Sequence, residues 1–225
     1  MPTLRVVSYN VHSLRDDRGA LHSAIRSLAP DVLIVQEAPR RFRWRQRCAE
    51  LARSVQMFYA VGGLPSLGNL ILTSLRVNVH DTWTMQFPLT PGRHLRGAAF
   101  ARCTLDREPF VVAGSHLATD PVERPGQATL LKKALSDLDV PLVLGADLNE
   151  GAVGTAWRTV AAGLTDAADA AGGADRHTFS CADPRDRIDA LLVDPRFTVV
   201  GYDVVDSELT RRASDHFPVV ADLSL

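Results

Sequence analysis

The segment GAAFARCTLDREPFVVAGSH, residues 97–116, decides the fold class of this chain. It holds two apolar runs of strand length, GAAFARCTL and FVVAGSH, with a few polar residues and no helical pattern between them. Strands that follow one another this directly pair antiparallel, because a parallel pair needs a long crossover. The segment therefore predicts a sheet that contains antiparallel pairs.

Seven more runs of this kind are spread along the chain, each rich in Val, Ile or Leu and bounded by Gly, Pro, Asp or Asn. They are LRVVSYN, DVLIVQE, GNLILTS, PLVLGADLN, IDALLVD, FTVVGYDVV and FPVVADLSL. Several are apolar at consecutive positions, which is typical of strands covered on both faces.

Three segments between the strands place apolar residues at helical spacing. Their stripes are Leu21, Ile25 and Leu28; Trp44, Cys48, Leu51 and Val55; and Leu130, Ala134, Leu135 and Leu138. Strands outnumber helices, so we predict sheets with antiparallel pairs packed between helices rather than a strictly alternating α/β fold. The length of 225 residues, without linker or repeat, predicts a single domain over residues 1–225.

The composition is that of an ordinary globular protein, with 46% hydrophobic and 23% charged residues. A net charge of -1 gives no overall attraction to nucleic acid or to an anionic membrane. The three cysteines are far apart and indicate neither a disulfide framework nor a zinc site. Without a signal-peptide pattern or an apolar run of about 20 residues, we expect a cytoplasmic monomer with no membrane span and no evident protein partner.

Polar side chains stand where the predicted strands end or begin. They are Asn10, Glu37, His116, Asp147 and Asn149 at strand ends, and Asp189, Asp215 and His216 at strand starts. Each has an ordinary explanation, such as a turn residue, a helix cap or a structural histidine. Antiparallel strands, however, bring the start of one beside the end of the next, so all eight groups can meet at one sheet edge.

Carboxylates and amides without cysteine are the ligands that Mg²⁺ or Mn²⁺ prefers. Such an ion polarises a phosphoryl group and neutralises charge on the leaving oxygen. A histidine steadied by a carboxylate takes a proton from water or donates a hydrogen bond to phosphoryl oxygens. The set therefore predicts metal-assisted hydrolysis of a phosphoester.

The motifs SYNVH, VQEAP, GNLILTS, GSHL, GADLN, RIDALLV and SDHFPV, in this order, resemble those of the endonuclease/exonuclease/phosphatase superfamily, which has the deoxyribonuclease I-like fold. The resemblance runs from Asn10 to His216. It implies an α/β (α+β) four-layer sandwich, in which two mixed, largely antiparallel β-sheets are flanked by helices and the site lies at one edge.

The resemblance also implies roles for the polar residues. The metal ligands would be Glu37, Asn10 and Asp215. The catalytic groups would be His216 oriented by Asp189, Asp147 and Asn149 acting on the attacking water, and His116 binding the scissile phosphate. Whether His216 or Asp147 is the general base, and whether one or two metal ions bind, stays open.

The substrate is predicted less sharply than the chemistry. We expect a nuclease acting on DNA; the alternatives are a phosphatase or phosphodiesterase for a small metabolite or lipid headgroup, and a non-catalytic module that binds phosphorylated ligands or a protein. The last would be marked by loss of Glu37, Asp147 or His216, and all three are present. Candidate substrate-binding residues are Asn69, Arg40, Arg41, Arg96 and Phe179, whereas the later arginines of PRRFRWRQR suit a solvated face.

Overall fold

The computed structural model describes residues 3–224 as two stacked six-stranded sheets. The first sheet has the order β11-β12-β1-β2-β4-β3, with β1 (Thr3–Asn10), β2 (Val32–Gln36), β3 (Phe58–Gly62), β4 (Leu70–Thr73), β11 (Thr198–Val204) and β12 (Val219–Ser224). The second has the order β5-β6-β7-β8-β10-β9, with β5 (Asn78–Gln86), β6 (Gly97–Leu105), β7 (Glu108–His116), β8 (Leu142–Asp147), β9 (Thr165–Asp166) and β10 (Asp189–Val193).

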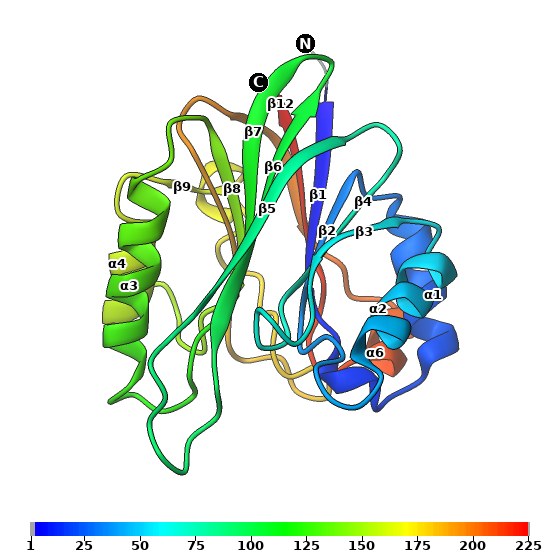
Figure 1. Cartoon of the computed structure of the whole chain (residues 1–225), viewed down its shortest axis with the longest axis horizontal. Coiled ribbons are helices and arrows are strands. Elements are labelled where there is room, and N and C mark those ends of the chain that lie inside the picture. The colour runs from blue at the N-terminus through cyan, green and yellow to red at the C-terminus, as the bar shows by residue number, and fades with distance from the viewer. Residues whose placement is uncertain (1–2, 225) are drawn as a thin grey trace.

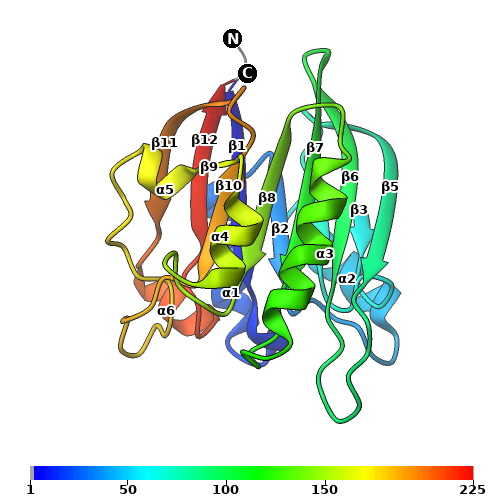
Figure 2. The ribbon, with the colours of Figure 1, turned by 90° about the vertical axis from the view of Figure 1, so that its left-hand side faces the viewer.

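Helices cover the outer face of each sheet, which gives four layers (Figures 1 and 2). The first sheet carries α1 (Arg18–Leu28), α2 (Trp44–Ser54) and α6 (Glu208–Ala213), and the second carries α3 (Arg124–Ser136) and α4 (Thr155–Ala161). A short α5 (Ala167–Ala170) and the 3-10 helix η1 (His12–Leu14) complete the described elements. The predicted four-layer sandwich is confirmed.

Both sheets are mixed and largely antiparallel, as predicted. Strands β6 and β7, the two runs of residues 97–116, pair antiparallel, with Gly97 opposite His116. Only β1–β2 and β7–β8 pair parallel among the described strands.

Consecutive apolar residues serve the two faces of each inner strand. In β1, Val6 packs between the sheets while Val7 packs against the helices; Ile34 and Leu33 divide in the same way in β2. A third cluster joins the second sheet to α3 and α4. Leu131 and Leu135 of α3 are buried in it, whereas Leu130 of the predicted stripe is 39% exposed.

The two sheets approach closely beside the site edge. Gly114 and Gly145 are register partners on β7 and β8, and both face Ile34 of the other sheet. A Cβ at Gly145 would lie 2.7 Å from Ile34 Cδ1 and 2.8 Å from Ser8 Oγ. Glycine at these positions therefore allows β1 and β2 to lie directly over β7 and β8. Within the described part of the chain, no helix is long and apolar enough to cross a membrane.

Candidate active site

One edge of the sandwich collects the polar strand ends. It is the lower edge in Figure 1, opposite the termini, where β1, β2, β7 and β8 end and β10 begins. In the second sheet, His116 is the register partner of Asp147 on β8, and Asp147 is the partner of Asp189 on β10. The strand register therefore places these three side chains side by side.

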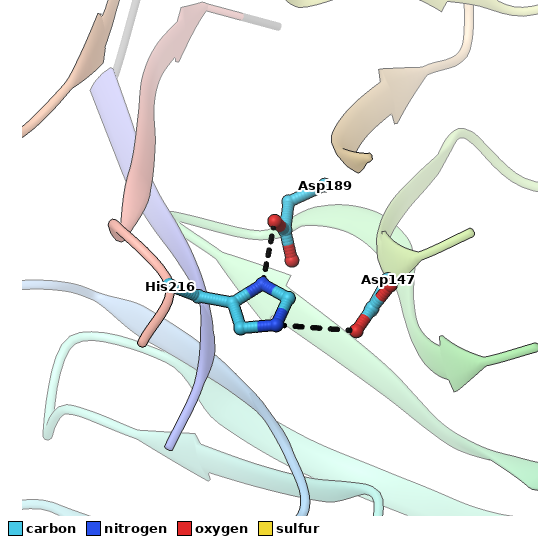
Figure 3. Close-up of side chains that lie close together, drawn as sticks. All are labelled: Asp147, Asp189 and His216. Carbon is cyan, nitrogen blue, oxygen red and sulfur yellow. Dashed lines mark hydrogen bonds and ion pairs between the residues drawn. The ribbon is translucent and has the colours of Figure 1, made fainter. Parts of the chain in front are cut away.

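His216 reaches this row from the segment that precedes β12 of the first sheet (Figure 3). Its Nδ1 lies 2.9 Å from Asp189 Oδ2, and its Nε2 lies 3.9 Å from Asp147 Oδ2. The Phe179 ring lies 4.7 Å from the imidazole, centroid to centroid. Thr178 Oγ1 accepts a hydrogen bond of 3.2 Å from the Asp189 backbone N–H. His216 is thereby held between the two carboxylates and packed against an aromatic face.

Asp147 is almost fully buried and contacts four residues of the site, Asn10, His116, Asn149 and His216. Its Oδ2 accepts a hydrogen bond of 2.9 Å from Asn10 Nδ2 and lies 3.2 Å from His116 Nε2. Its Oδ1 accepts a hydrogen bond of 3.0 Å from the Asn149 backbone N–H. The Asn149 side chain donates to the carbonyl of Leu117.

His116 has an arginine rather than a carboxylate at its other nitrogen. Arg96, in the loop before β6, places Nη1 3.2 Å from His116 Nδ1, and both side chains are buried. Arg96 Nε is buried without a hydrogen-bond partner in the described structure. Arg96 therefore contacts the site through His116.

Glu37 and Asp215 lie outside the buried network. Ser13 Oγ donates to Glu37 Oε2 over 2.8 Å, and His12 Nε2 lies 3.8 Å from Asp215 Oδ2. The Asp215 side chain is 38% exposed. Glu37 directly follows Gln36, the register partner of Asn10, so the ends of β1 and β2 bring these two residues to the same edge.

The network sets opposite proton affinities on its two histidines. Burial disfavours protonation of His216, but the charge and hydrogen bond of Asp189 and the charge of Asp147 outweigh it and raise its pKa to about 10. Burial, and then the charge of Arg96, hold the pKa of His116 well below its ordinary value. Burial, together with the charge of Asp189, raises the pKa of Asp147.

Two of the predicted substrate-binding residues donate hydrogen bonds to backbone carbonyls, and a third is exposed. Arg40 Nη1 donates to the carbonyls of Leu67 and Leu95, and so joins the β2–α2 loop to two neighbouring loops. Asn69 Nδ2 donates to the carbonyls of Ser66 and Gly97, while its Oδ1 is buried without a partner in the described structure. Arg41 is exposed.

Sequence reasoning missed three residues that contact the site. His12 and Ser13 belong to η1, directly after Asn10, and they contact Asp215 and Glu37. Thr178 supports the start of β10. His12 and Ser13 closely follow Asn10, a polar residue at a strand end, and could have been predicted from that position. They lie in a short turn whose sequence has no periodicity.

The structure brings together one group of possible metal ligands, which differs from the predicted one. Ligand atoms of Asp147, Asp189 and His216 lie within 4.8 Å of one another, and the buried Asp189 Oδ1 has no hydrogen-bond partner in the described residues. That group is almost closed to solvent, and Asp189 and His216 already bond each other. Of the predicted ligands, Glu37 and Asp215 are partly exposed and Asn10 is buried, and each can offer an oxygen of the kind that Mg²⁺ prefers.

Buried carboxylates and imidazoles that meet at one edge of the sheets can supply the proton transfers and hydrogen bonds of phosphoester hydrolysis. Residues 7–216 match the model of the Endonuclease/Exonuclease/phosphatase family, and the chain belongs to that family. Its members are phosphoric ester hydrolases that use divalent metal ions, so the predicted phosphoesterase class is confirmed. A comparison with curated proteins found no match.

Solved structures of the same fold differ in what they act on. The mannosyl-6-phosphatase Bt3783 of Bacteroides thetaiotaomicron has a TM-score of 0.82 and 16% identity, over 99% of this chain and 100% of that one. D. rerio TDP2, complexed with a single-strand DNA product, has a TM-score of 0.83 and 20% identity over 100% of both chains. A family member from Beutenbergia cavernae is 25% identical, with a TM-score of 0.77, over 100% of this chain and 72% of that one. The likeness covers the whole fold and leaves the substrate open.

Proposed function

We propose that the chain hydrolyses a phosphodiester, with DNA as the substrate, at the edge where Asp147 lies between His116 and His216. The observation that carries this proposal is the network around the Asp147 carboxylate. Two imidazoles and the Asn10 amide surround its Oδ2, and the Asn149 backbone N–H bonds its Oδ1. A structural cluster would not need this convergence, since burying ionisable groups is costly.

His216 and Asp147 form the acid–base pair in this proposal. Asp189 fixes the ring of His216 through Nδ1, so that only Nε2 faces the reacting group. The Asn10 amide donates to Oδ2 of Asp147, and the Asn149 backbone N–H donates to its Oδ1. The carboxylate is thereby fixed in an orientation from which it would accept a hydrogen bond from the attacking water. His116 would donate from Nε2 to a phosphoryl oxygen, and Phe179 packs on the His216 ring.

The metal ion would be Mg²⁺ or Mn²⁺, held by Glu37, Asn10 and Asp215. When bound, it would polarise the phosphoryl group and neutralise charge on the leaving oxygen. Hydrogen bonds within the chain orient two of these ligands. Ser13 Oγ donates to Glu37 Oε2, and the His12 backbone N–H donates to Asn10 Oδ1 over 3.1 Å.

A generic phosphodiester tests the chemistry without assuming a natural substrate. Hydrolysis of bis-p-nitrophenyl phosphate should require Mg²⁺ or Mn²⁺ and stop with EDTA. Alanine at Glu37 or at His216 should lower kcat by about a hundredfold or more, because each removes a group that acts on the reacting atoms. The exposed His80 serves as the matched histidine control. Full activity in both Glu37→Ala and His216→Ala would contradict the site.

Exposed arginines that follow Glu37 in the chain favour DNA among the possible phosphodiesters. Arg41, Arg43 and Arg45 are exposed in and after the β2–α2 loop, and no described residue forms an ion pair with them. Phe42, in the same loop, is 86% exposed and could stack on a base. Exposed arginines without an ion-pair partner among the described residues, close in sequence to an exposed ring, suit a nucleic-acid strand. The TDP2 structure with single-strand DNA shows that this fold can hold such a ligand in a relative.

A small phosphorylated metabolite is the second candidate, because the mannosyl-6-phosphatase shares the fold over nearly the full length of both chains. A panel of plasmid, abasic duplex, single-stranded DNA, RNA, inositol phosphates and phospholipids, each with Mg²⁺ and Mn²⁺, separates the two. Cleavage confined to DNA would support the nuclease. Release of phosphate from small monoesters alone would replace it with the phosphatase.

A further inference from the structure

We propose that Arg96 acts through His116: it fixes the imidazole in the tautomer that carries its proton on Nε2, and so makes His116 a hydrogen-bond donor toward the reacting centre. Arg96 is thus a positioning residue. The tautomer follows from the contacts alone, while its effect on catalysis rests on the proposed function.

The first contact determines which nitrogen of His116 lacks a proton. A guanidinium has N–H donors and no acceptor. Arg96 Nη1 lies 3.2 Å from His116 Nδ1, so a hydrogen bond between them requires a lone pair on Nδ1. His116 must therefore be neutral, with its single proton on Nε2.

The second contact agrees with the first from the opposite side of the ring. His116 Nε2 lies 3.2 Å from Asp147 Oδ2, and a carboxylate oxygen accepts. With the proton on Nδ1 instead, two donors would face each other at Arg96 and two acceptors at Asp147. Both contacts select one tautomer, in the way that a partner at one ring nitrogen commonly sets the other.

The backbone holds Arg96 in place for this task. Its carbonyl accepts from the Phe87 N–H over 2.9 Å, and the next residue, Gly97, is the register partner of His116. The side chain is 8% exposed, and no carboxylate of the described residues lies within ion-pair distance of it. A buried cation without a counter-ion is costly, so a purely structural role does not explain it.

A neighbouring arginine provides the contrast. Arg124 is equally buried, but its guanidinium pairs with Glu150 over 2.9 Å and donates to the carbonyls of Ala118 and Thr119. The charge of Arg124 is therefore neutralised by a carboxylate and its N–H groups have acceptors, as expected of an arginine with a structural role. Arg96 has an imidazole in place of the carboxylate, and its buried Nε stays without a partner in the described structure.

The tautomer can be read directly by long-range ¹H–¹⁵N spectra of ¹⁵N-histidine-labelled protein, with His116 assigned by its loss in His116→Gln. The wild type should show His116 neutral, with the proton on Nε2. In Arg96→Met the Nδ1 lone pair loses its donor, so its ¹⁵N resonance should move toward that of an imidazole nitrogen without a hydrogen bond. Arg96→Lys, which keeps a donor, should restore part of the wild-type signal. Arg5→Met, at the opposite edge of the sandwich, is the control and should leave the His116 signals unchanged.

Kinetics on bis-p-nitrophenyl phosphate give the second readout. Arg96→Met should lower kcat by about tenfold to a hundredfold with KM little changed, since it removes a partner that orients a catalytic group. A rise in KM alone would mean that Arg96 only binds substrate. A His116 proton on Nδ1 in the wild type, or an Nδ1 resonance that is unchanged in Arg96→Met, would overturn the proposal whatever the activity. An inactive wild type with the expected tautomer would instead contradict the proposed function.

Discussion

The two histidines that flank Asp147 have nearly equal burial and opposite proton affinities. His216 and His116 are 5% and 4% exposed, and each directs Nε2 toward Asp147 Oδ2. They differ in the partner of Nδ1: a carboxylate, Asp189, for His216, and a guanidinium, Arg96, for His116. At nearly equal burial, the neighbour at the far ring nitrogen therefore decides the proton affinity. It favours a cation at His216 and a neutral donor at His116.

The two histidines also depend on different parts of the fold. His116 and Asp147 are register partners within the second sheet. His216 precedes β12 of the first sheet and must reach Asp189 and Asp147 across the interface between the sheets. Its position therefore depends on how closely the sheets pack, and that of His116 does not.

Removing the carboxylate of Asp189 should have the largest effect on the difference between the two histidines. In Asp189→Asn the amide no longer stabilises a protonated His216, so the pKa of His216 should fall and its ring should lose a fixed orientation. We expect kcat on bis-p-nitrophenyl phosphate to drop by about a hundredfold or more. Asp194→Asn, just after β10 at its other end, is the matched control and should retain full activity. An active Asp189→Asn enzyme would show that His216 needs no such partner.

The sequence predicts the inner strands better than the outer ones, for a physical reason. The missed strands β3, β5 and β9 all lie at sheet edges, and β5 is exposed over most of its length. Edge strands with one covered face or none lack the continuous apolar run that marks a buried strand. The inner strands, packed on both faces, carry that run and can be predicted from it.

The residues of the candidate site also differ in how far the sequence predicts their contacts. Residues at strand ends, such as Asn10, His116, Asp147 and Asp189, could be expected to converge because strand direction and register place them. The contact between Arg96 and His116 could not be predicted, since Arg96 lies in a loop whose path depends on tertiary packing. The same holds for Arg40, whose contacts with Leu67 and Leu95 bring together three loops far apart in sequence.

A change in the packing between the sheets should separate the two histidines. In Gly145→Ala the new Cβ would meet Ile34 Cδ1 and Ser8 Oγ, so the sheets must move apart. We expect a loss of about 1–3 kcal/mol in the free energy of unfolding, measured with urea, and a reduced kcat. His116 should keep its contact with Asp147, visible as unchanged His116 ¹⁵N signals, while those of His216 shift.

Glycine to alanine elsewhere controls for the backbone effect of this substitution. A Cβ added at Gly126 in α3 would meet no atom within 4 Å, so Gly126→Ala should leave both histidines unaffected and should not destabilise the helix. Equal losses at Gly145 and Gly126 would mean that sheet contact is not what positions His216.

The smallest expected effect is a pH dependence of stability in the metal-free protein. Folding raises the pKa of His216 from 6.5 to about 10, so the folded state holds one more proton than the unfolded state between these values. The resulting stabilisation is complete below pH 6.5 and is lost as pH rises toward 10. Urea unfolding in EDTA should therefore show the advantage of wild type over His216→Gln shrinking from about pH 7 to about pH 9. His80→Gln should leave the wild-type slope unchanged, and a constant gap between wild type and His216→Gln would mean that His216 is neutral in the folded protein.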